Sequence, residues 1–234
     1  MYAFTLPFTS SVQSPAGITI PALADAESAR TATATANLID GVTTNPSLLA
    51  SAGTDFKILL KEICHEIKGP VSAEVTAPDV PSMLKEADVL RKIAKNIVIK
   101  VPLTWNGLQA CNMLSAKKIK VNVTLCFSAS QALLAAKAGA AYISPFIGRL
   151  DDIGENGIQL IEDIKKIFNN YKNIKTKILS ASIRSVDHFN AVAGIGSDVA
   201  TVPVKIFKEL YKHHLTDKGV DIFTADWKKS GMKI

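Results

Sequence analysis

The most constraining feature of this sequence is a regular alternation of strand-like and helix-like segments from residue 40 onward. The helical segments place apolar residues three or four positions apart, as Leu60, Ile63 and Ile67 do, whereas the strand-like segments are short apolar runs. Strands that are joined by helices pair in parallel, so this alternation predicts a parallel α/β sheet. The strands are expected at residues 41–44, 71–75, 97–103, 120–127, 142–147, 177–183 and 199–204.

An eighth strand near residues 18–25 would close the sheet, and we therefore predict a (β/α)8 TIM barrel with an irregular first strand. Pro21 makes that strand irregular because proline has no backbone N–H to donate to a sheet. The sequence has no glycine-rich phosphate fingerprint that would favour a Rossmann fold. We expect a single barrel domain over residues 18–234, with residues 1–17 as an unassigned N-terminal extension.

Polar side chains share one face of several predicted strands. Side chains alternate across a strand, so Ser72 and Glu74 lie on one face while Ala73 lies on the other. The polar faces carry Ser72, Glu74, Asn122, Thr124, Ser180, Ser182 and Arg184. Branched aliphatic residues normally fill the inside of a TIM barrel, so inward polar residues indicate a ligand chamber. The alternative is a hydrogen-bonded structural network.

Lys100 lies inside the apolar run 97–103, which is typical of a buried strand. Removing an ammonium group from water costs several kcal/mol, so burial favours the neutral amine, which is a nucleophile that can form a Schiff base with a carbonyl group. Two other interpretations are a lysine at a strand end that reaches solvent and a buried ion pair with a carboxylate.

Groups that a Schiff-base enzyme needs lie on the neighbouring strands. Glu74 and Thr124 could hold between them a water molecule that carries protons during the reaction. Sugar hydroxyl groups could be bound by Asn45, Asn122 and Ser144, although each of these could instead cap a loop.

Two arginines follow predicted strands, at the end of the barrel where substrates bind. The guanidinium groups of Arg149 and Arg184 can grip a phosphate through paired hydrogen bonds, with Ser182 beside the second. Either arginine could instead form a surface ion pair with an acid such as Asp151 or Asp187.

Charge and cysteine content exclude several classes of protein. The net charge is 27 − 21 = +6, and the excess lysines are spread over helices, which is typical of solvated surfaces rather than of a nucleic-acid interface. No apolar stretch approaches the roughly 20 residues that span a bilayer. The three cysteines form no metal motif and no disulfide framework, which favours the reducing cytoplasm.

Several segments resemble the motifs of the transaldolase family, in the same order along the chain. These segments are residues 40–48, 97–104, 122–128, 144–149, 180–184 and 198–203. The resemblance implies a class I aldolase-type (β/α)8 barrel that uses no metal or other cofactor. It also implies transfer of a dihydroxyacetone unit between sugar phosphates in the non-oxidative pentose phosphate pathway, by a homo-oligomer that is a pentamer or a decamer.

The resemblance also implies a role for each matching residue. Lys100 would be the Schiff-base nucleophile, and Glu74 and Thr124 would place the catalytic water. The substrate would be bound by Thr43, Asn45, Asn122, Ser144, Phe146, Arg149, Ser182 and Arg184, the last three at its phosphate.

One departure from the family pattern and one close relative within the family keep alternatives open. The family has an acid/base aspartate on its first strand, and Asp25 is the candidate here, although its spacing to Gly41 is about two residues short. A misplaced Asp25 would leave a sugar-phosphate-binding barrel with impaired catalysis. The second alternative is a fructose-6-phosphate aldolase, which resembles this chain in size. Its members tend to have glutamine and tyrosine where this chain has Glu74 and Phe146, so both positions favour transaldolase.

Overall fold

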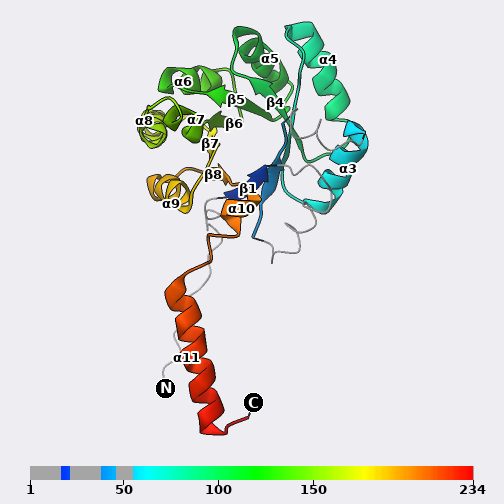
Figure 1. Cartoon of the computed structure of the whole chain (residues 1–234). Coiled ribbons are helices and arrows are strands. Elements are labelled where there is room, and N and C mark those ends of the chain that lie inside the picture. The colour runs from blue at the N-terminus through cyan, green and yellow to red at the C-terminus, as the bar shows by residue number, and fades with distance from the viewer. Residues whose placement is uncertain (1–16, 22–37, 46–54, 234) are drawn as a thin grey trace, which may run out of the picture.

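The computed structural model describes residues 17–21, 38–45 and 55–233. Within them, eight parallel strands form a closed barrel in the order β1 to β8, which confirms the predicted (β/α)8 architecture (Figure 1). The strands are β1 (Gly17–Pro21), β2 (Gly41–Thr43), β3 (Val71–Glu74), β4 (Ile97–Pro102), β5 (Val121–Cys126), β6 (Tyr142–Pro145), β7 (Lys177–Ser180) and β8 (Val199–Thr201).

Closure depends on the first strand, which the sequence marked as irregular. The strand β1 pairs with β2 on one side, through Thr19 and Gly41, and with β8 on the other, through Gly17 and Val199. Pro21 is its last residue and lies opposite Thr43 of β2.

The strands β2 to β8 end one to three residues before their predicted ends, and at two of them the backbone enters the left-handed region near the end. Leu125 has φ 62°, and the register between β5 and β6 shifts between Val123 and Cys126. Ser182 has φ 61°, so regular pairing of β7 stops at Ser180 and only an isolated bridge at Ala181 continues it. Such backbone states are costly for residues other than glycine and often occur at functional sites.

Helices connect the strands and cover the outside of the barrel (Figure 1). They are α3 (Phe56–Glu66), α4 (Val80–Leu90), α5 (Trp105–Ala116), α6 (Ala129–Lys137), α7 (Ile147–Asp151), α8 (Gly157–Asn169), α9 (Val186–Ile195), α10 (Val204–Phe207) and α11 (His214–Ser230). Many begin at a side-chain cap. At α9, for example, the hydroxyl of Ser185 accepts a hydrogen bond from the backbone N–H of His188 at 3.1 Å.

The main core lies between the barrel and its helices. Ile99 and Val101 flank Lys100 on β4 and are fully buried, as are Leu60 and Ile161 on the surrounding helices. Each such side chain contributes about 1.5–3 kcal/mol when it leaves water. Because these neighbours point outward, alternation along β4 directs Lys100 toward the inside of the barrel.

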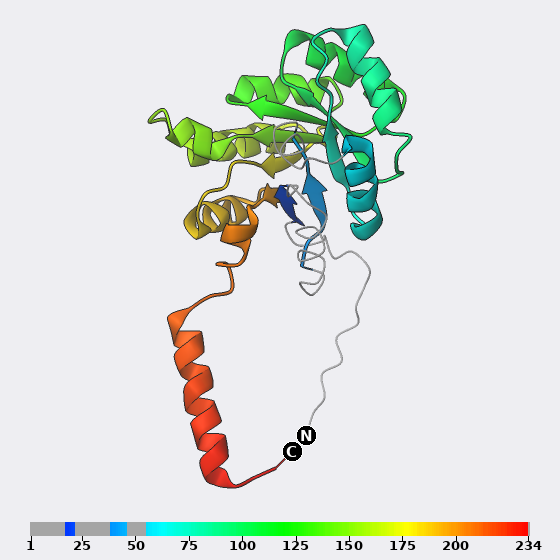
Figure 2. The same ribbon diagram turned by 45° about the vertical axis from the view of Figure 1, so that its right-hand side comes forward.

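The last helix differs from the others. Both views show α11 extending away from the barrel (Figures 1 and 2), and none of its residues is buried. Among the described helices, none is long and apolar enough to cross a membrane.

Candidate active site

A cavity of about 190 Å³ lies at the C-terminal end of the barrel, where TIM-barrel enzymes place their active sites. Its wall is built from residues at or just after the ends of β2, β4, β5, β6, β7 and β8. The residues expected from the sequence that line it are Thr43, Asn45, Lys100, Thr124, Ser144, Phe146, Arg149 and Ser182.

Lys100 is buried, with 7% of its surface exposed, so it does not reach bulk solvent from a strand end. Its Nζ lies 2.8 Å from Oε2 of Glu74 and donates a hydrogen bond to the carbonyl oxygen of Thr44 at 3.1 Å. The register sets this pair, because Glu74 on β3 lies opposite Lys100 on β4. An ammonium and a carboxylate at this distance stabilise each other's charge and offset the cost of burial. Burial alone predicts a neutral amine, whereas this contact favours an ion pair.

Thr124 supplies a hydroxyl group on the next strand, and it lines the same cavity as Lys100. The register places it opposite Pro102, two residues beyond Lys100 on β4. Its Oγ1 is buried and has no hydrogen-bond partner among the described residues. Buried polar atoms are nearly always paired, so this hydroxyl suits a water molecule or a ligand.

A hydrogen-bonded layer supports the cavity. Ser144 donates a hydrogen bond from Oγ to Oδ1 of Asn122 at 2.8 Å, and Nδ2 of Asn122 donates to Oγ of Ser72 at 3.2 Å. Asn122 is fully buried and does not line the cavity, so its amide orients Ser144 instead of facing the open space. For Asn122 the structural-network interpretation therefore fits, while Ser144 belongs to both the network and the cavity wall.

One side of the cavity is formed by residues that follow β6 and β7. Arg149 lines it, and its guanidinium carbon lies 5.0 Å from the ring centroid of Phe146, in a cation–π contact. Phe146 also packs against Phe127, with their ring centroids 5.9 Å apart. Ser182 reaches the wall through its left-handed backbone conformation.

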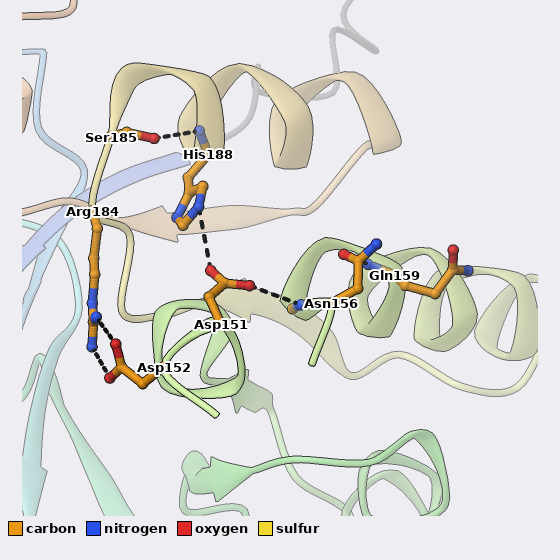
Figure 3. Close-up of polar contacts among 8 residues, drawn as sticks. Asp151, Asp152, Asn156, Gln159, Arg184, Ser185 and His188 are labelled. Atoms are coloured by element: carbon orange, nitrogen blue, oxygen red, sulfur yellow. Dashed lines mark hydrogen bonds and ion pairs between the residues drawn. The ribbon is translucent and has the colours of Figure 1, made fainter. Parts of the chain in front are cut away.

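Arg184 does not line the cavity. Both terminal nitrogens of its guanidinium group contact the carboxylate of Asp152, as Figure 3 shows. These hydrogen bonds lower the pKa of Asp152 and raise that of Arg184. The sequence predicted that either arginine could have such a partner, but named the neighbouring acids Asp151 and Asp187.

A second pair lies beside the first (Figure 3). Nε2 of His188 is 3.3 Å from Oδ2 of Asp151, whose other oxygen accepts a hydrogen bond from the backbone N–H of Gly157 at 3.1 Å. The adjacent acids at the end of α7, Asp151 and Asp152, thus contact two basic residues that follow β7, His188 and Arg184.

One predicted residue is not described by the structure, and two residues of the cavity wall were not predicted. Asp25, the predicted acid/base residue, lies outside the described residues. Thr44 and Thr201 were missed, although both line the cavity. Oγ1 of Thr201 lies 2.9 Å from Oγ1 of Thr43. Both missed residues lie in the segments that resemble transaldolase motifs, which were the available signal. Alternation puts the Thr44 side chain on the face opposite to Thr43, and its backbone carbonyl is what contacts Lys100.

Cysteine and metal chemistry have little support among the described residues. Burial raises the pKa of the Cys126 thiol to about 12, so it stays protonated and unreactive near neutral pH. No group of three or more His, Cys, Asp or Glu side chains in this part of the chain could hold a metal ion.

Comparison with known proteins gives a consistent picture. The family model "Transaldolase/Fructose-6-phosphate aldolase" matches residues 23–234. A protein of Parvibaculum lavamentivorans named "Probable transaldolase" is 59% identical over 84% of this chain and 90% of its own length. A protein of the same name from Maricaulis maris is 57% identical over 85% of this chain and 91% of its own length. These matches cover nearly all of the barrel, and the chain therefore belongs to the transaldolase/fructose-6-phosphate aldolase family.

Proposed function

We propose that this protein is a transaldolase that carries a dihydroxyacetone unit between sugar phosphates as a Schiff base on Lys100. The reaction would convert sedoheptulose 7-phosphate and glyceraldehyde 3-phosphate into erythrose 4-phosphate and fructose 6-phosphate. The observation that carries the proposal is the buried Lys100, which pairs with Glu74 at 2.8 Å and lines the cavity. The proposed setting is the non-oxidative pentose phosphate pathway in the cytoplasm.

The first steps use the Lys100–Glu74 pair. Glu74 accepts a proton from the ammonium of Lys100, and the free amine attacks C2 of the ketose phosphate to give a carbinolamine. The carbinolamine hydroxyl then leaves as water and the imine forms. Thr124 and Glu74 hold the water molecule through which these protons move, a role that the unpartnered Thr124 hydroxyl supports.

The following steps break and remake a carbon–carbon bond. We assign to Asp25 the removal of the C4 hydroxyl proton, so that the C3–C4 bond breaks and the first aldose phosphate leaves. The electron pair stays on the Lys100 adduct as an enamine. This enamine attacks the aldehyde carbon of the second aldose phosphate, and hydrolysis of the new imine returns the amine.

The remaining side chains bind the substrate. Thr43, Asn45 and Ser144 line the cavity beside Lys100 and suit the sugar hydroxyl groups, with Asn122 orienting Ser144. Arg149, Ser182 and Arg184 are proposed to hold the phosphate, because guanidinium groups bind phosphate oxygens in pairs.

Phe146 favours transfer over release of free dihydroxyacetone. It lines the cavity, and its side chain has no proton to give to the enamine carbon, so the intermediate survives until an acceptor arrives. A coupled assay measures fructose 6-phosphate cleavage with and without erythrose 4-phosphate. We expect turnover only with the acceptor, whereas equal turnover without it would identify an aldolase.

We also propose that the protein is a homo-oligomer, either a pentamer or a decamer. The support is α11, a 17-residue helix without buried residues that nevertheless carries large apolar side chains. Leu215, Phe223 and Trp227 are 59%, 75% and 43% exposed. Exposed apolar surface of this kind is characteristic of protein–protein contacts.

A further inference from the structure

The contact between Arg184 and Asp152 has an unusual position for a surface ion pair. Both side chains are about half exposed, at 49% and 51%. Arg184 directly follows Ser182 and Ile183, which line the cavity, and its side chain passes over Gly148, the residue before the cavity-lining Arg149. The ion pair therefore lies at the rim of the cavity and not on a remote surface.

The surroundings leave Asp152 as the acid that holds Arg184. Asp151 also faces the guanidinium group, but its two oxygens already contact His188 and the backbone N–H of Gly157. The positive charge of Arg149 in α7 also helps to lower the pKa of Asp152, although the two side chains form no ion pair. The Asp152 carboxylate thus pairs with Arg184 and is influenced by the charge of Arg149, and both arginines are proposed to bind the substrate phosphate.

We propose that Asp152 is a positioning residue that holds Arg184 at the rim until the phosphate group of a sugar phosphate displaces it. This inference rests on the proposed function, since it assumes that Arg184 binds substrate phosphate. A phosphate dianion presents the same pair of oxygens to the guanidinium fork as a carboxylate does, with about twice the charge. A sugar without phosphate has no group that can compete for the fork.

Phosphate can replace Asp152 at Arg184 because the Arg184–Asp152 ion pair is exposed to solvent. Water and salt screen such a pair, which contributes little to stability. Asp152 therefore reduces the affinity for phosphate by a modest factor. If Asp152 were instead a permanent brace that aims Arg184 at the phosphate, its removal would weaken phosphate binding, so the two roles predict opposite signs.

The test measures binding of inorganic phosphate to the full chain by calorimetry, together with KM and kcat for fructose 6-phosphate. We expect Asp152→Asn to bind phosphate roughly two- to fivefold more tightly, the range that an exposed ion pair supports, and to lower KM more than it changes kcat. Asp152→Ser should likewise bind phosphate more tightly and have a lower KM for fructose 6-phosphate. In a protein that already carries Arg184→Gln, Asp152→Asn should not increase the affinity for phosphate.

The control is Asp187→Asn, which removes one negative charge close to Arg184 along the chain. Asp187 is exposed and forms no ion pair with a described residue, so phosphate affinity should change little. Unchanged or weaker phosphate binding by Asp152→Asn, or an equal gain in the Asp187 variant, would overturn the proposal. Calorimetry needs no turnover, so the predicted binding pattern without dihydroxyacetone transfer would refute the proposed function alone.

Discussion

Lys100 and Glu74 face each other from neighbouring strands, with 2.8 Å between Nζ and Oε2. Glu74→Gln keeps the shape of the side chain but removes the group that accepts the Lys100 proton. We expect kcat to fall by roughly 10²- to 10⁴-fold, the usual contribution of a general acid or base. The matched control is Glu162→Gln on the exposed surface of α8, which should keep its activity. Equal kcat values for the two variants would contradict the role of Glu74.

Substitutions of Thr124 and Ser144 distinguish a cavity hydroxyl that takes part in catalysis from one that stabilises the fold. Thr124→Val removes a hydroxyl that has no partner among the described residues, so stability should be unchanged or higher while kcat falls roughly two- to tenfold. Ser144→Ala removes the donor to Asn122 and should cost about 0.5–1.5 kcal/mol of unfolding free energy. Urea unfolding and steady-state kinetics measure both effects. A loss of stability in Thr124→Val without a change in kcat would reverse the assignment.

At the residue scale, the sequence predicted which face of a strand a side chain lies on better than how far along the barrel axis it lies. Alternation along β5 placed Asn122 and Thr124 on the same inward face, and the structure confirms that both are inside the barrel. Alternation does not say how far along the barrel axis a residue lies, so it could not separate Thr124 in the cavity wall from Asn122 in the layer beneath. Arg184 follows its strand in a loop, where alternation no longer fixes direction.

At the scale of elements, the connection after β7 packs closely on the start of α7. A Cβ added at Gly148 would lie 2.5 Å from the carbonyl oxygen of Ser182 and equally close to Nε of Arg184. Gly148→Ala should therefore push the Ser182 segment away, costing about 1–3 kcal/mol and raising KM for sugar phosphates.

The control for this prediction is Gly194→Ala in α9. A Cβ there meets nothing within 4 Å, so the change should stabilise the helix by about 0.5–1 kcal/mol. Thermal unfolding and KM measurements compare the two variants. An unchanged KM and melting temperature in Gly148→Ala would show that the connection has room to move.

The order of the elements was predicted from the sequence more accurately than the residues at which they end. The order of strands and helices was predicted because hydrophobic periodicity differs between the two. The end of β5 was predicted to within one residue, but that of β7 was three residues too late. The left-handed conformation at Ser182, just beyond β7, depends on tertiary contacts that the local sequence does not reveal.

At the scale of the whole molecule, α11 is the element that the barrel itself does not bury. Removing residues 214–234 should reduce the assembly to a smaller species, as measured by light scattering after gel filtration. Phe223→Glu should have the same effect because it places a charge on the exposed apolar surface, whereas Thr224→Glu on the same helix is the control. An unchanged mass after the truncation would place the subunit contacts elsewhere.

The most direct test of the account is reductive trapping of the covalent intermediate. The full chain is mixed with fructose 6-phosphate, reduced with borohydride, digested and mapped by mass spectrometry. The account predicts a dihydroxyacetone-derived adduct on the peptide that contains Lys100, and none in a Lys100→Arg variant. An adduct on another lysine, or no adduct in a chain that transfers dihydroxyacetone, would contradict it.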